Sequence, residues 1–317
     1  MSGLVSGYSG IIAPPNLATN GTFRINQRGL FETSGGEPAK ANDYFADCWA
    51  VSSNTNVDYL TIENNAVHGD AVNLRGYGKK GQLIWLRNRS NNTLSGGYMG
   101  HIPLTTSVMI GVNTNSVPII GKSLGRYRSS DYNVIDESGV YIKQGERKQV
   151  IGIIESVLDT SISQSRVLCY LEEDGEFHIT IGDFIELAGA YRNPPKFAPV
   201  PYADDLARCM RYFQTYRIQG YFEPWHLGPT GGSDYAYQHN FTIPKMAAIP
   251  SESVSLHLID AYNTSGGSAN ITSEVSAVAK VPYQGFVRTR LTHSGSWTGR
   301  ISSNGNYHDL TVNLEVV

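Results

Sequence analysis

Hydrophobic and polar residues alternate in short runs along most of residues 22–187. Such alternation is typical of β-strands that bury one face, because successive side chains of a strand point to opposite sides. Clusters of Asn, Asp, Ser and Gly separate the runs and favour tight turns. The predicted strands are 22–26, 57–62, 71–75, 82–86, 108–112, 139–142, 150–154, 166–171, 178–181 and 184–187. This pattern predicts an all-β domain over residues 24–192, a β-sandwich with jelly-roll wiring.

The pattern changes at residues 193–201, where four prolines stand close together and exclude both a helix and a central strand. Immediately afterwards, apolar residues follow the i, i+3, i+4, i+7 spacing of an amphipathic helix. These apolar residues are Leu206, Cys209, Met210 and Phe213. Asp204 and Asp205 suit the positive end of a helix that begins there. Residues 193–218 are therefore predicted to form a proline-rich linker and one short helix.

The two ends of the chain differ in pattern. Alternation resumes after the helix, over 240–243, 253–258, 274–278, 285–289 and 310–316, and predicts a second, smaller β-sandwich over residues 219–317. Residues 1–17 are rich in Gly and Ser, then Pro, and carry no apolar period that could bury a face. We expect an extended N-terminal arm over residues 1–23.

Composition narrows the classes of partner. The chain has 25 Lys and Arg against 28 Asp and Glu, a net charge of −3, so it offers no basic field for nucleic acid. The longest uncharged apolar run, residues 150–154, is far shorter than a membrane span, and the N-terminus lacks the pattern of an export signal. Cys48, Cys169 and Cys209 are widely spaced, which predicts buried free thiols in a protein made in a reducing cytosol.

No motif predicts a catalytic residue, a metal site or a cofactor. Residues 76–81 match GxGxxG, but a strand pattern follows them, whereas a dinucleotide loop opens a helix. The histidines lack metal-binding spacing, and a GxSxG nucleophile motif is absent. Residues 172–174, Glu-Glu-Asp, could supply a carboxylate pair, although acids before a glycine are typical of a turn. A glycosidase whose carboxylates are distant in sequence stays open.

Four aromatic residues are candidates for binding glycan. Trp225, Tyr235, Tyr237 and Trp297 lie among Gly, Ser and Pro residues, where loops would expose a flat ring. Sugar rings stack on such faces while neighbouring polar groups bind the hydroxyls. The alternative is that these rings pack on the rim of a sandwich or in a subunit interface.

Two regions resemble bacteriophage tail-fibre and receptor-binding virion proteins with a carbohydrate-binding-like jelly roll. Residues 16–29, NLATNGTFRINQRG, and 44–49, YFADCW, are similar to that family's opening motif N-G-x-F-x-I-x-Q-R-G followed by Y-x-x-D-R-W, with Cys48 in place of Arg. Residues 183–190, DFIELAGA, 197–202, FAPVPY, and 206–213, LARCMRYF, resemble its last strand, Pro-Tyr turn and helix. Residues 241–250 resemble the segment that follows.

The motif residues themselves predict structural roles. Phe23 and Trp49 are expected in the core, and Arg28 is expected to pair with acids such as Asp47. The resemblance implies a virion component, usually a homotrimer, that is assembled in the bacterial cytoplasm and attached to other virion proteins through its N-terminal arm. Three functions remain open: a short tail fibre or appendage that adheres to host-surface polysaccharide, a capsid decoration, head fibre or tail connector, and a polysaccharide depolymerase.

Overall fold

The chain divides into two compact units, residues 1–205 and 206–317, and each is described by itself. A computed structural model describes the residues in the following ranges. They are 16–27, 38–41, 43–64, 71–88, 103–125, 134–136, 139–155, 165–194, 200–218, 234–246, 249–257, 260–262, 268–270, 275–283, 285–294 and 309–315. Within these ranges, no helix is long and apolar enough to cross a membrane.

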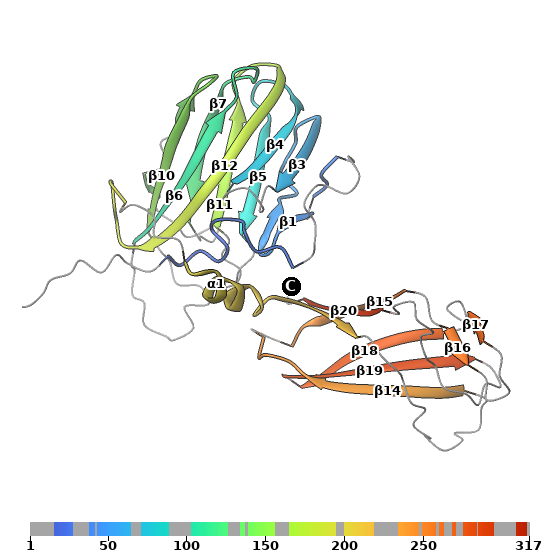
Figure 1. Ribbon diagram of the computed structural model, residues 1–317. Helices are drawn as coiled ribbons and strands as arrows, with labels where there is room; N and C mark the ends of the chain where they lie inside the picture. The colour runs from blue at the N-terminus through green and yellow to red at the C-terminus, as the bar shows by residue number, and fades with distance from the viewer. Residues whose placement is uncertain are drawn as a thin grey trace, which may run out of the picture. The chain divides into compact units, whose positions relative to one another are not determined.

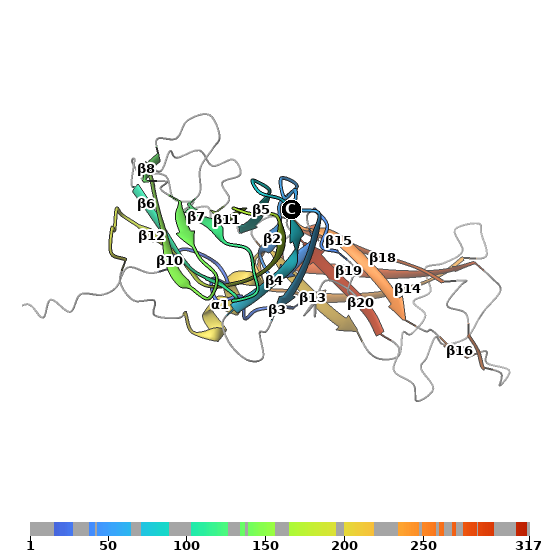
Figure 2. The same cartoon turned by 90° about the horizontal axis from the view of Figure 1, so that it is seen from above.

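The first unit is a sandwich of two six-stranded sheets, which form two layers in Figures 1 and 2. The β4 sheet has the order β3-β4-β12-β6-β10-β8, and the β5 sheet has the order β1-β2-β5-β11-β7-β9. Their strands are β1 (Tyr44–Ala46), β2 (Trp49–Val51), β3 (Tyr59–Asn64), β4 (Ala71–Gly78), β5 (Leu83–Asn88), β6 (Pro103–Val112), β7 (Ile119–Leu124), β8 (Val134–Asp136), β9 (Val140–Ile142), β10 (Arg147–Glu155), β11 (Ser165–Leu171) and β12 (Gly175–Ala188). The chain passes from one sheet to the other at most connections, as the predicted jelly roll requires.

The core lies between the two sheets and is built from the inward side chains of alternating strands. In β5, for example, Ile84 and Leu86 are buried, while Trp85 between them is only partly covered. Rings from distant segments join this core, since Trp49 lies 4.9 Å from Phe23 and 5.0 Å from Phe184 between ring centroids. The predicted core positions of Phe23 and Trp49 are confirmed, because both side chains are fully buried.

Residues 16–27 differ from the prediction. The expected strand over 22–26 is wrong, because this segment is an irregular loop that turns at Asn20 and Phe23, where φ is 53° and 59°. The buried amide of Asn20 takes the place of a strand partner: it accepts from the N–H of Ile25 and donates to the carbonyls of Ile25 and Asp47. Residues 16–23 thus belong to the first unit, whereas the arm was predicted to reach residue 23; residues 1–15 lie outside the described residues.

The predicted pairing of Asp47 with Arg28 is not tested, whereas the prediction of buried free cysteines is confirmed. The Asp47 carboxylate accepts from the backbone N–H and the side-chain amide of Gln27, while its predicted partner Arg28 lies outside the described residues. All three cysteines are buried and free, as predicted, and burial raises the pKa of the Cys169 thiol to about 12.

The predicted amphipathic helix is present as α1 (Tyr202–Cys209), with Asp204 and Asp205 in its first turn. It is shorter than the apolar spacing suggested, because Phe213 begins β13 (Phe213–Ile218). The second unit contains two three-stranded antiparallel sheets, β13-β20-β15 and β14-β19-β18, and a hairpin of β16 and β17. The remaining strands are β14 (Asp234–Thr242), β15 (Ser251–His257), β16 (Asp260–Tyr262), β17 (Ser268–Asn270), β18 (Val275–Tyr283), β19 (Phe286–Ser294) and β20 (Asp309–Glu315). The all-β prediction is confirmed.

Candidate functional site

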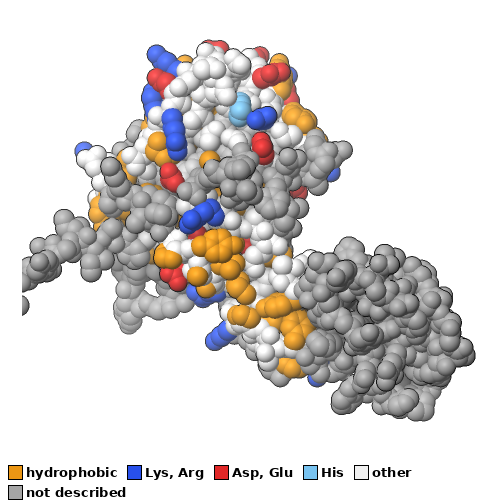
Figure 3. All heavy atoms as spheres, in the orientation of Figure 1, with side chains coloured by type: hydrophobic (Ala, Val, Ile, Leu, Met, Phe, Trp, Pro, Cys, Tyr) orange, Lys and Arg blue, Asp and Glu red, His pale blue; other side chains and the backbone are white. Residues whose placement is uncertain are grey.

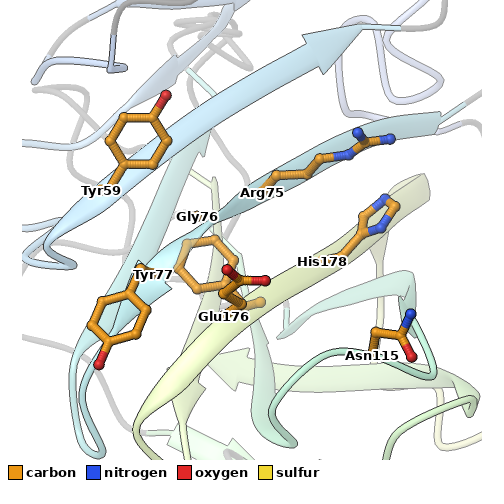
Figure 4. A pocket seen from close by; sticks show the side chains of 8 residues that line it. Tyr59, Arg75, Gly76, Tyr77, Asn115, Glu176 and His178 are labelled. Carbon is orange, nitrogen blue, oxygen red and sulfur yellow. The ribbon is translucent and has the colours of Figure 1, made fainter.

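A shallow groove of about 370 Å³ lies on the outer face of the β4 sheet (Figure 4). It combines aromatic, charged and amide side chains in one place. Its lining is formed by Tyr59, Arg75, Gly76, Tyr77, Asn115, Glu176, Phe177 and His178. The space-filling view shows basic, acidic and histidine side chains close together on this face of the first unit (Figure 3).

Strand register brings together the lining residues of β3, β4 and β12, and Asn115 joins them from the connection between β6 and β7. Tyr77 of β4 stands opposite Tyr59 of β3 on one side and Glu176 of β12 on the other. One row further along, Arg75 stands opposite His178. Side chains directly opposite one another in an antiparallel pair lie on the same face, with Cβ atoms about 4.5–5.5 Å apart. The rows therefore form one continuous surface.

Gly76 lies on β4 between the row of the two tyrosines and the row of Arg75, and it lines the floor of the groove. A Cβ atom at this position would lie 1.9 Å from the carbonyl oxygen of Tyr59 and 2.5 Å from the ring of Phe177. Both distances are shorter than van der Waals contact, so no larger residue fits without moving the β3 backbone. The groove at this point therefore requires a glycine.

The two tyrosines present ring surface to solvent, with 40% of Tyr59 and 45% of Tyr77 exposed. In Figure 4 they stand at one end of the groove, with Arg75, His178 and Asn115 toward the other end and Glu176 between. Aromatic faces beside a few fixed polar groups are the usual composition of a site for a small polar ligand.

His178 is held in a defined orientation. Its backbone N–H donates to Ser116 Oγ at 3.0 Å, and its Nδ1 lies 3.2 Å from Nδ2 of Asn113. Because an amide nitrogen only donates, Nδ1 accepts and the neutral ring carries its proton on Nε2. Partial burial lowers the pKa of His178 and the positive charge of Arg75 lowers it further, while Glu63 opposes the shift. Nε2–H is thus a donor for a ligand at neutral pH.

Arg75 is only loosely paired. Its Nη2 lies 3.8 Å from Oε2 of Glu63 on β3, and both side chains are substantially exposed. This separation exceeds the 2.7–3.2 Å range of a hydrogen bond, so the contact orients the guanidinium by charge alone.

The outer face of the β5 sheet also carries aromatic rings, but cationic side chains lie over them. The guanidinium carbon of Arg166 is 4.6 Å from the centroid of Trp85, and Nζ of Lys122 is 5.7 Å from that of Tyr170. Both distances are within the range of a cation–π contact.

The structure does not describe the side chains of the four residues predicted to bind glycan. Trp225 and Trp297 lie outside the described residues. Tyr235 and Tyr237 lie on β14, where their backbones pair with His293 and Leu291 of β19. Sequence reasoning missed the groove, although Tyr59, Arg75 and His178 all fall in strands that alternation predicted.

Two motifs are turns, as predicted. The glycine-rich residues 76–81 end β4 and lead into β5, with Gly81 at a φ of 84°. The acidic residues 172–174 connect β11 to β12, and the Asp174 carboxylate accepts the N–H of Lys80 at 2.7 Å. In the part of the chain that the structure describes, no three His, Cys, Asp or Glu side chains are grouped to hold a metal ion.

Comparison with known proteins gives distant likenesses. No family model matches the chain, and no curated protein matches it. A proposed sugar-binding protein of Bacteroides thetaiotaomicron is 12% identical with a TM-score of 0.34, covering 55% of this chain and 100% of that one. The tandem CBM22-1–CBM22-2 domain of Xyn10C from Paenibacillus barcinonensis is 11% identical with a TM-score of 0.27, covering 90% and 92%. At such scores these likenesses establish neither a family nor a ligand.

Proposed function

We propose that the protein is a non-enzymatic adhesin of a bacteriophage virion, a short tail fibre or appendage whose groove on the β4 sheet binds host-surface polysaccharide. The observation that carries the proposal is the row of Tyr59, Tyr77 and Glu176 beside Arg75 and His178. The exposed rings can stack on the C–H faces of a sugar. The polar groups can bind its hydroxyls, since they include both donors and acceptors.

Binding without cleavage is part of the proposal. Glycoside hydrolysis by two carboxylates needs an acid and a second carboxylate facing each other across the bond, about 5–10 Å apart. In the described part of the chain, Glu176 is the one carboxylate that lines the groove. The groove is also shallow, which suits the capture of a chain at a surface better than the exclusion of water.

The virion role is supported by the resemblance of residues 16–29, 44–49 and 183–213 to phage receptor-binding proteins. In this proposal the protein forms a homotrimer that is assembled in the bacterial cytoplasm, and residues before Asn16 attach it to other virion proteins. Three weak glycan sites on one particle component would act together, since linked sites raise the apparent affinity without new contacts.

The test combines light scattering with binding of the full chain to host cells. A Tyr77→Ala variant removes a ring of the groove, and Tyr141→Ala, on β9 of the other sheet and 43% exposed, is the matched control. We expect the full chain to be a trimer. Tyr77→Ala should weaken its cell binding about fivefold to tenfold per site, whereas Tyr141→Ala should leave cell binding unchanged. A well-folded oligomer that binds no host would instead favour a capsid decoration or tail connector.

Prolonged incubation with purified host polysaccharide tests the absence of catalysis. We expect no new reducing ends. Their appearance in step with added protein would make the protein a depolymerase.

A further inference from the structure

Charge is unevenly distributed along the groove. The rings of Tyr59 and Tyr77 stand at one end, and Glu176, which pairs with Tyr77 in the strand register, lies between them and the other end (Figure 4). At the other end Arg75 and His178 share the next row, and Asn115 lies beside them. One end is thus rich in π-electrons and negative charge, and the other in positive charge and N–H donors.

The tyrosine end suits a cation. A protonated amine is attracted to the face of an aromatic ring within about 6 Å, and two rings with a carboxylate provide such faces and a counter-charge together. In the described part of the chain, the carboxylate of Glu176 has no hydrogen-bond or ion-pair partner. A neutral sugar hydroxyl would gain far less from this combination, since it carries no charge to complement Glu176.

The arginine end suits an anion. The guanidinium of Arg75 presents several N–H donors in a plane, a geometry that matches a carboxylate. Its 3.8 Å contact with Glu63 is too long for a hydrogen bond, so these donors can turn to a ligand. The Nε2–H of His178 and the amide of Asn115 add neutral donors at the same end.

We infer that the groove selects a zwitterionic stretch of glycan, in which a protonated amine and a carboxylate lie close together, with the amine at the tyrosine end and the carboxylate at Arg75. This inference rests on the proposed function and names the class of glycan that the same groove takes. The two charges have different partners, because Glu176 pairs with Tyr77 and Arg75 with His178 in neighbouring rows of the sheet.

Four tetrasaccharides separate the two charges. Chitotetraose is neutral, its de-N-acetylated form carries only amines, a heparosan tetramer carries only carboxylates, and the de-N-acetylated heparosan tetramer carries both. Binding to the full chain is measured by calorimetry at low salt and again at 0.5 M NaCl. We expect each charge to tighten binding about threefold, so the zwitterion binds about tenfold more tightly than chitotetraose, and salt removes most of this difference.

Two variants assign the charges to their partners. Glu176→Gln should remove the gain from the amine and keep the gain from the carboxylate, whereas Arg75→Gln should do the reverse. Exposed residues outside the groove serve as controls of equal charge change: Glu173→Gln for the first variant and Lys143→Gln for the second. Circular dichroism of all four variants checks that folding is unchanged.

The outcomes distinguish this inference from the function on which it rests. If the protein binds host polysaccharide but prefers no charged tetramer over chitotetraose, the inference is wrong and the adhesin proposal stands. If the amine gain survives Glu176→Gln, the assignment of the tyrosine end is wrong. If neither host polysaccharide nor any tetramer binds, both the inference and the proposed function fail.

Discussion

On the β5 sheet, Arg166 lies over the ring of Trp85 and Lys122 lies near that of Tyr170, whereas on the β4 sheet Tyr59 and Tyr77 keep 40% and 45% of their surface exposed. Both pairs of rings occupy outward positions of two neighbouring strands, β5 and β11 in one sheet and β3 and β4 in the other, so alternation alone does not distinguish them. The difference lies in the neighbouring side chains: on the β5 sheet Arg166 and Lys122 lie over the rings, whereas on the β4 sheet Glu176, Arg75 and His178 line a groove with Gly76.

An outward aromatic residue is therefore a candidate binding surface only when its neighbours leave its face accessible. On the β5 sheet, cationic side chains pack over the rings. We expect this packing to stabilise the first unit, because it gives cation–π contacts and removes ring surface from water. On the β4 sheet, the ring of Tyr77 is 45% exposed, so we expect it to contribute little to folding, and in our proposal it contacts the ligand. Predictions that separate stability from binding test this division.

The largest effect is expected from Gly76→Ala. The new methyl group would collide with the carbonyl oxygen of Tyr59 at 1.9 Å and force β3 away from β4, so we expect the free energy of unfolding to fall by about 3 kcal/mol and glycan binding to be lost. Gly111→Ala on β6 of the same sheet is the control, because its nearest contacts would be an ordinary 3.7–3.8 Å. Thermal unfolding followed by circular dichroism measures the stability of both variants. Equal stability of the two variants would contradict the close approach.

Trp85→Ala tests the other face. Loss of the ring removes its contact with Arg166 and the apolar surface it covers, and we expect the free energy of unfolding to fall by about 2 kcal/mol while glycan binding stays within twofold of the wild type. Urea unfolding and calorimetric binding give the two values. A variant that unfolds normally but no longer binds glycan would move the site to the β5 sheet.

Tyr77→Ala should show the opposite behaviour. Its ring is 45% exposed, so we expect a change in the free energy of unfolding of at most about 0.5 kcal/mol, with the loss of binding described above. In the same two assays, Trp85→Ala should lose stability and keep glycan binding, whereas Tyr77→Ala should keep stability and lose glycan binding. A destabilisation as large as that of Trp85→Ala would mean that Tyr77 is a packing residue.

The smallest effect concerns pH. Burial and the charge of Arg75 lower the pKa of His178 in the folded chain below its ordinary value of 6.5. At a pH between the folded-state pKa and 6.5, the unfolded chain therefore binds more protons than the folded one. The stabilisation from the neutral ring is complete above pH 6.5 and is lost as the pH falls toward the folded-state pKa. We expect a small destabilisation at pH 5 relative to pH 7.5 that is reduced in His178→Gln. A titration of the His178 resonance above 6.5 would contradict the sign.

Alternation predicted strands well where one face is buried by large residues. Strands β4, β5 and β11 follow it, since inward residues such as Leu74, Ile84 and Val167 are large and apolar. Strand β7 was missed, because two of its inward positions hold Gly121 and Ser123. A Cβ at Gly121 would come within 2.9 Å of Ile110, so the core requires a small residue where the pattern expects a large one.

The alternation pattern predicted a strand wrongly at residues 22–26, because the backbone there is irregular. Phe23 and Ile25 are buried and alternate with polar residues, as in a strand, but the side chain of Asn20 takes the hydrogen bonds that a neighbouring strand would otherwise make. The motif that resembles phage receptor-binding proteins covers this segment, but it does not indicate the backbone conformation.

The candidate site could be predicted only in part. Each of Tyr59, Arg75 and His178 falls in a predicted strand, but the register that sets Arg75 opposite His178 joins residues about a hundred positions apart. That register depends on the pairing of β4 with β12, and local sequence patterns carry no information on which strands pair.

The most direct measurement is amide hydrogen exchange of the full chain with and without oligosaccharide fragments of the host polysaccharide. We predict slower exchange in residues 59–64, 71–78 and 175–180, the segments that carry most of the groove's lining residues, and no change in 83–88 and 165–171 of the opposite sheet. Binding accompanied by slower exchange only in residues 219–317 would contradict the account. It would place the glycan site among the aromatic residues that the sequence suggested in the second unit, such as Trp225 and Trp297.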